Sequence, residues 1–175
     1  MQPEFMVSKF SFGSPIRWTV GAIVVSVACF IFLMPIGSPK EASKRTACLS
    51  NVKQMSLAAL AYANDHDDKL PLAVNWMDST PMYVGRGNYA PSEPERVYHD
   101  VTFSGDQYGY AFRLQASSKE ISSIKTPSSF ALIFDSKLMQ RNAGSGLETL
   151  PSPGRHQGRN SVGYLDGHAK SVTEP

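Results

Sequence analysis

The sequence has little net charge and no basic cluster. Its 17 Lys and Arg residues nearly balance its 15 Asp and Glu residues, so the formal net charge at pH 7 is only +2. No run of Lys or Arg is interleaved with aromatic residues. Because nucleic-acid binding needs several cationic contacts to phosphates, we expect no nucleic-acid partner.

Motifs that mark many catalytic and nucleotide-binding sites are also missing. The chain contains no G-x-S-x-G, no H-E-x-x-H, no P-loop and no G-x-G-x-x-G. No serine or cysteine stands out as a nucleophile. We therefore predict that the protein is not an enzyme and needs no cofactor, with a bound divalent ion as the one option left open.

Cysteine is scarce, with two residues in 175, Cys29 and Cys48. If both lie on one helix, the spacing places them roughly 28 Å apart at 1.5 Å per residue. A disulfide needs Cα atoms within about 7 Å. An intramolecular disulfide is therefore not expected.

The longest uncharged run lies near the start, after a short N-terminal segment of residues 1–17. Residues 18–37 carry no charge, and as a helix they would span roughly 30 Å, the thickness of the hydrocarbon core of a bilayer. We predict a transmembrane helix here. A cleaved signal peptide and a lipoprotein lipidated at Cys29 are the alternatives. The basic residues flanking the run are balanced, so they leave its orientation open.

Residues 41–68 predict a long amphipathic helix. They contain neither Gly nor Pro, and apolar residues recur at steps of 4, 3, 4 and 3, at Cys48, Val52, Met55, Ala59 and Tyr62. This spacing is typical of a face that packs on a core.

An acidic group closes this predicted helix, at Asp65, Asp67 and Asp68. A calcium site is one interpretation, but the spacing does not fit an EF-hand loop, which needs a glycine at its sixth position. A solvated turn is the simpler interpretation.

The remainder of the chain predicts a loop followed by a sheet. Residues 75–105 are rich in Pro, Gly, Ser and Asn, and the aromatic residues Trp76, Tyr83 and Tyr89 are available to pack that loop or to bind a partner. Residues 108–172 contain short strands, including an apolar run at 129–135. A type I′ hairpin is expected around Asp166-Gly167, since both turn positions need φ > 0.

Four residues form a candidate metal site. Asp135 ends the apolar strand, His156 precedes the hairpin, and Asp166 and His168 lie at its turn. If the hairpin pairs beside that strand, these side chains would suit Zn²⁺ or a similar ion. The structural alternative is that His156 makes a hydrogen bond that holds its loop, while Asp166 and Gly167 only form the turn.

Two stretches resemble a known family. The segment ACLSNVKQMSLAALAYANDHDDKLP is similar to the first soluble helix of bacterial pilin-like and pseudopilin-like proteins. His156, nine residues, then Asp166-Gly167 resembles the signature of the prepilin-type processing-associated family with the H-x9-D-G domain. The similarity covers most of residues 47–172.

This resemblance implies an α+β fold: a transmembrane helix continues into a long amphipathic helix that packs on a small antiparallel sheet, with residues 40–175 as the head. It implies a structural protein of the bacterial cell envelope, in a type II secretion or pilus-like assembly. It also implies a single-pass inner-membrane location with the head on the extracytoplasmic side. The partners would be the membrane and copies of itself or other pilin-like subunits.

The start of the chain departs from the family pattern. Gly13 matches the residue before the processing site, but Ser14-Pro15-Ile16-Arg17-Trp18 follows, without the expected glutamate. This leaves two alternatives to an assembling subunit. One is a tethered binding module that uses the aromatic residues of 75–105, and the other is a metal-dependent enzyme that uses the four candidate ligands.

Overall fold

The computed structural model describes residues 21, 23–27, 29, 39–85, 94–103, 105 and 107–173. The chain divides into two compact units, Met1–Gly37 and Ser38–Pro175. Residues 1–17, with Gly13, lie outside the described residues, as does Tyr89.

The predicted membrane span is the first expectation that needs correction. Of residues 18–37, only 21, 23–27 and 29 are described, and they are helical. Among the described residues, no helix combines the length and the apolar character that crossing a bilayer requires. The longest, α2, carries charged residues such as Lys40, Glu41 and Lys44 in its first turns. The expectations of a transmembrane helix and of a single-pass inner-membrane protein are therefore wrong.

Helix α2 runs from Pro39 to Asn64 and contains 26 residues. Proline suits the first turn, where its missing N–H would have had no intrahelical partner. The helix ends four residues before the predicted position, and Asp67 and Asp68 follow with positive φ. Its fully buried residues begin only at Cys48. The predicted long amphipathic helix continuing from a membrane span is thus wrong.

A five-stranded sheet follows, in the order β3-β1-β2-β4-β5. Its strands are β1 (Tyr110–Arg113), β2 (Ala131–Asp135), β3 (Gly144–Ser145), β4 (Asn160–Tyr164) and β5 (Ala169–Val172). The pairs β1–β2, β2–β4 and β4–β5 are antiparallel, but β3 pairs parallel with β1. The predicted antiparallel sheet is therefore mixed. Two residues of a Gly- and Ser-rich stretch form the extra edge strand.

Short helices fill the connections. They are α3 (Trp76–Ser79) and the 3-10 helices η1 (Pro81–Tyr83), η2 (Pro94–Tyr98), η3 (Leu114–Ala116), η4 (Ile121–Ser123), η5 (Pro127–Ser129) and η6 (Leu147–Thr149). Three of them lie in the stretch predicted as loop. Trp76 and Tyr83 from this stretch are buried in the core.

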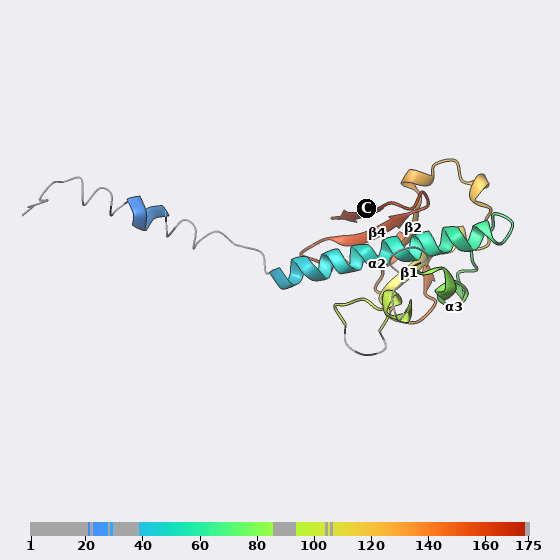
Figure 1. Ribbon diagram of the computed structural model, residues 1–175, viewed down its shortest axis with the longest axis horizontal. Helices are drawn as coiled ribbons and strands as arrows, with labels where there is room; N and C mark the ends of the chain where they lie inside the picture. Colours follow the sequence, from blue (N-terminus) through green and yellow to red (C-terminus); the bar gives the residue numbers. More distant parts are fainter. Residues whose placement is uncertain are drawn as a thin grey trace, which may run out of the picture. The chain divides into compact units, whose positions relative to one another are not determined.

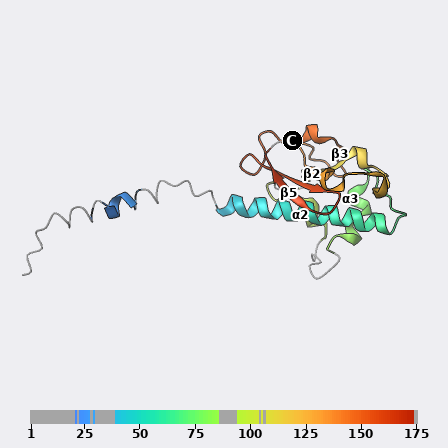
Figure 2. The ribbon, with the colours of Figure 1, turned by 90° about the horizontal axis from the view of Figure 1, so that it is seen from above.

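Helix α2 packs along one face of the sheet, chiefly against β4 (Figures 1 and 2). Gly163 of β4 makes this approach possible, because a Cβ there would lie 2.8 Å from Val52 Cγ1. The other face of the sheet is covered by Ala143 and Leu150, which pack with Phe134 and Val162. As its continuous apolar sequence indicated, β2 is buried along its whole length.

Candidate functional site

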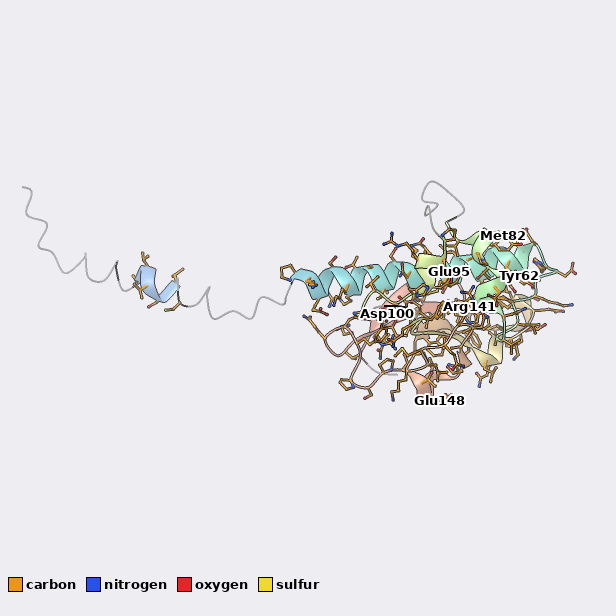
Figure 3. All side chains as sticks on the ribbon, turned by 90° about the horizontal axis from the view of Figure 1, so that it is seen from below. Tyr62, Met82, Glu95, Asp100, Arg141 and Glu148 are labelled. Carbon is orange, nitrogen blue, oxygen red and sulfur yellow. The ribbon has the colours of Figure 1, made fainter. Side chains whose placement is uncertain are left out.

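Three residues that are distant in sequence meet inside the head. Cys48 comes from the first buried turn of α2, Asp100 from the segment after η2, and His156 from the loop before β4. Each offers a ligand atom, and these atoms all lie within 4.8 Å of one another. Figure 3 labels Asp100 among the side chains that pack beneath α2 in that view. All three side chains are buried.

Asp100 is the most connected member of this cluster. Its Oδ1 accepts hydrogen bonds from the Cys48 thiol at 3.2 Å and from the Thr102 backbone N–H at 2.8 Å. Its Oδ2 accepts from Arg155 Nη1 at 2.6 Å. Burial alone would raise the pKa of Asp100, but the hydrogen bonds from Thr102 and the charge of Arg155 outweigh it and lower that pKa. Asp100 is therefore a buried carboxylate that remains ionised.

Arg155 brings a positive charge to the edge of the cluster. Its guanidinium also donates to the carbonyl oxygens of Gly109, at 2.8 Å, and of Ser136. It stacks over the ring of Phe103, with 4.7 Å from its central carbon to the ring centroid. These contacts fix Arg155 and, through the chain, the position of its neighbour His156.

His156 has an unusual environment for a buried histidine. Its side chain is 1% exposed, and neither ring nitrogen has a hydrogen-bond partner among the described residues. The nearby Asp135 carboxylate is 3.9 Å from Nε2, beyond hydrogen-bond distance. Burial lowers the pKa of His156, so the neutral form is favoured. The predicted hydrogen bond from the His156 ring is therefore not observed among these residues, although the His156 backbone N–H donates to the Arg159 carbonyl of the same loop at 3.0 Å.

Asp135, at the end of β2, borders the cluster. Its Oδ2 accepts from the Ser161 backbone N–H at 2.6 Å, while its Oδ1 has no partner among the described residues. Burial raises its pKa to about 7, although the bond from Ser161 opposes that rise. Burial likewise raises the pKa of the Cys48 thiol to about 12, and the charge of Asp100 adds to the effect.

The four residues predicted as metal ligands do not converge. Asp135 and His156 lie together, but Asp166 and His168 are exposed at the β4–β5 turn and pair with each other. Gly167 of that turn lies against Leu57 of α2. Leu57 is nine residues beyond Cys48, or about 13 Å along the helix. The H-x9-D-G motif thus spans two separate places in the fold.

The turn itself differs in detail from the prediction. The β4–β5 hairpin is present, and Gly167 has φ of 86°. The φ angle of Asp166 is not positive, so the turn is not type I′. The Gly167 N–H donates to the Tyr164 carbonyl, and the Tyr164 N–H donates to the His168 carbonyl. This is a three-residue loop that ends in a left-handed glycine.

The other sequence-based candidates have structural roles or are exposed. Asp65, Asp67 and Asp68 are exposed, and Asp68 Oδ2 accepts from the Ser122 backbone N–H at 3.0 Å. Trp76 is 0% and Tyr83 6% exposed, so these two aromatic residues are not available on the surface for a partner. Among the described residues, the binding-module alternative is therefore left without an exposed aromatic residue of those predicted to contact a partner.

Cys48 and Asp100 were missed as site residues. The sequence placed Cys48 on the packing face of a helix and left Asp100 within the predicted loop of residues 75–105, which is rich in Pro, Gly, Ser and Asn. Neither neighbours His156 in sequence, and no short motif joins the three. Only the packing of α2 against the segments around β1 and β4 brings them together.

Comparisons with known proteins add no relationship. No family model matches the chain, and neither the curated proteins nor the solved structures contain a match.

Proposed function

We propose that this chain is a pilin-like structural protein without enzymatic activity, which associates with copies of itself or with similar subunits. The supporting observation is the placement of α2. One face of α2, with Val52 and Met55, is buried in the head. Ser50, Lys53 and Leu57, at steps of three and four on the same helix, are exposed. A subunit whose helices pack side by side needs this arrangement.

The location of the H-x9-D-G residues also supports a structural role. His156 is buried, so it has no direct route to an external substrate. Asp166 is exposed, but it accepts a hydrogen bond from the His168 backbone N–H at 3.1 Å and so stabilises its own turn. The motif residues thus stabilise two parts of the head, which is consistent with a structural subunit rather than an enzyme.

Cysteine cross-linking tests the proposal. A cysteine would be placed at Lys53 in a full chain that also carries Cys29→Ser, and oxidised at increasing protein concentration. We expect disulfide-linked dimers from Lys53→Cys, and light scattering should show species larger than the monomer. Lys125→Cys is the matched control, because Lys125 is exposed on a loop far from α2 in sequence. Equal cross-linking of the two variants, together with a purely monomeric wild type, would overturn the proposal.

A further inference from the structure

We propose that Cys48, Asp100 and His156 bind a zinc ion in the interior of the head. The inference does not depend on the proposed assembly role, because it concerns the far side of α2 from the exposed residues Ser50, Lys53 and Leu57. It rests on the identity of the donors, on their spacing and on the unpaired polar atoms around them.

The donors suit zinc rather than calcium or magnesium. Cys48 supplies sulfur, His156 nitrogen and Asp100 oxygen. Thiolate and imidazole are preferred by zinc and similar late divalent ions, whereas calcium and magnesium take oxygen ligands. Three protein ligands with a fourth position for water or a further carboxylate give the usual tetrahedral zinc coordination.

The spacing is close to that of a formed site. The three ligand atoms lie within 4.8 Å of one another. Bond lengths of about 2.0–2.3 Å around a tetrahedral zinc put neighbouring ligand atoms about 3.3–3.7 Å apart. The largest of these separations would therefore shorten by about 1.1–1.5 Å on binding.

The unpaired atoms point to a ligand at this position. Buried histidines whose two ring nitrogens both lack partners are rare in native proteins, because each such nitrogen loses its contact with water and gains no hydrogen bond. Zinc bonded to one ring nitrogen of His156 would give that nitrogen a partner and leave only the other nitrogen unpaired. The Asp135 carboxylate, now 3.9 Å from Nε2, is placed to accept the other ring N–H. A carboxylate that orients a zinc-bound histidine is a common arrangement.

The charges in the cluster also balance when zinc is bound. Binding releases the Cys48 thiol proton to solvent, and the Zn–S bond replaces the S–H donated to Asp100. The Zn²⁺ charge is then offset by the Cys48 thiolate and the Asp100 carboxylate. Arg155, bound to Asp100 at 2.6 Å, offsets the nearby Asp135 carboxylate. The charges of the zinc ion, the Cys48 thiolate, the two carboxylates and Arg155 then sum to zero, as a buried site requires.

A nucleophilic role for the same residues is less consistent with the fold. Cys48 is 0% exposed on the buried face of α2, where its thiol contacts Asp100, so a substrate would need that packing to open. A zinc ion bound by these three buried residues would join α2, the segment around Asp100 and the loop before β4.

The first test uses Co²⁺ as a spectroscopic substitute for zinc in the full-length protein. The Cys29→Ser variant, in which Cys48 is the one remaining thiol, would be freed of metal and titrated with Co²⁺. We expect one equivalent of Co²⁺ to produce a near-ultraviolet thiolate-to-cobalt band and visible bands of tetrahedral cobalt, and Zn²⁺ to abolish both. A folded Cys29→Ser protein without the thiolate band would overturn the proposal, whether or not any Cys48 variant folds.

The second test uses thermal unfolding in Zn²⁺ and in chelator. An ion that binds the folded state raises the melting temperature with its concentration. We expect a rise of several degrees in the wild type and in His168→Gln, and none in Cys48→Ser or His156→Gln. His168 is the matched control because it is an exposed histidine at the β4–β5 turn. An equal rise in Cys48→Ser would place the ion elsewhere and overturn the proposal. A loss of zinc binding with intact cross-linking at Lys53→Cys would leave the assembly role in place.

Discussion

At the scale of residues, the fully buried Thr80 shows how polar groups are accommodated in the core. Its hydroxyl donates to the Trp76 carbonyl at 2.8 Å and lies 2.7 Å from the Tyr98 hydroxyl. Burial raises the pKa of Tyr98 to about 12, so its hydroxyl stays protonated at neutral pH and donates to Thr80. Trp76 Nε1 in turn donates to the Ala143 carbonyl at 3.1 Å. These bonds join α3 and its C-cap residue Thr80 to η2 and to Ala143, the residue before β3.

Replacing Thr80 with valine should lower the free energy of unfolding by about 1–3 kcal/mol, because the buried Tyr98 hydroxyl loses its partner. Adding Tyr98→Phe should recover part of this loss, since an apolar pair of similar shape leaves no unpaired group. Urea unfolding of the wild type, the two single variants and the double variant measures the coupling. Full additivity of the two losses would show that the hydroxyls do not interact.

At the scale of elements, the contact between α2 and β4 depends on a residue without a side chain. Gly163 faces α2, and a Cβ there would overlap Ser56 Oγ and lie 2.8 Å from Val52 Cγ1. Val52 and Ser56 are one helical turn apart and both buried, so neither can move away without disturbing the core. The glycine therefore sets how closely the helix approaches the sheet.

Gly163→Ala should destabilise the head by about 1–3 kcal/mol through overpacking. The change in the chemical denaturation midpoint measures it. Lys170→Ala on the neighbouring strand β5 is the control, because Lys170 is exposed and its loss should change the stability by less than about 0.5 kcal/mol. A Gly163→Ala protein as stable as Lys170→Ala would mean that α2 can shift on the sheet at little cost.

At the scale of the whole molecule, residues 38–175 form a compact unit with its own interior. Two apolar clusters lie on the two faces of the sheet, one including Trp76, Tyr110 and Phe112, the other Phe134 and Leu150. All of these residues belong to this unit. A chain with two covered sheet faces buries enough apolar surface to be stable by itself.

A chain of residues 38–175 should therefore fold without the preceding residues. We expect one cooperative thermal transition, with a midpoint within a few degrees of the corresponding transition of the full-length protein, and near-ultraviolet circular dichroism from the packed aromatic residues. A fragment with secondary structure but without that dichroism or cooperativity would show that residues 1–37 contribute to the core.

Local pattern was sufficient for several parts of this fold. The four-three spacing from Cys48 to Ala59 identified the buried face of α2, because helical periodicity is a property of neighbouring residues. The apolar run before Asp135 identified β2, and Asp166-Gly167 identified the β4–β5 hairpin. The same reasoning extended the helix to residue 68, but α2 ends at Asn64, and Asp67 and Asp68 take positive φ, which a right-handed helix does not allow.

Tertiary contacts decided what local pattern could not. The edge strand β3 exists because Gly144 pairs with Phe112, a contact between distant segments. Asp166 and His168 were grouped with His156 by sequence proximity, yet the hairpin carries them to an exposed turn. Cys48 and Asp100 reach His156 because α2 and the segment before β1 close over the loop that precedes β4. A cluster assembled from three elements depends on how those elements pack, and no spacing along the chain encodes it.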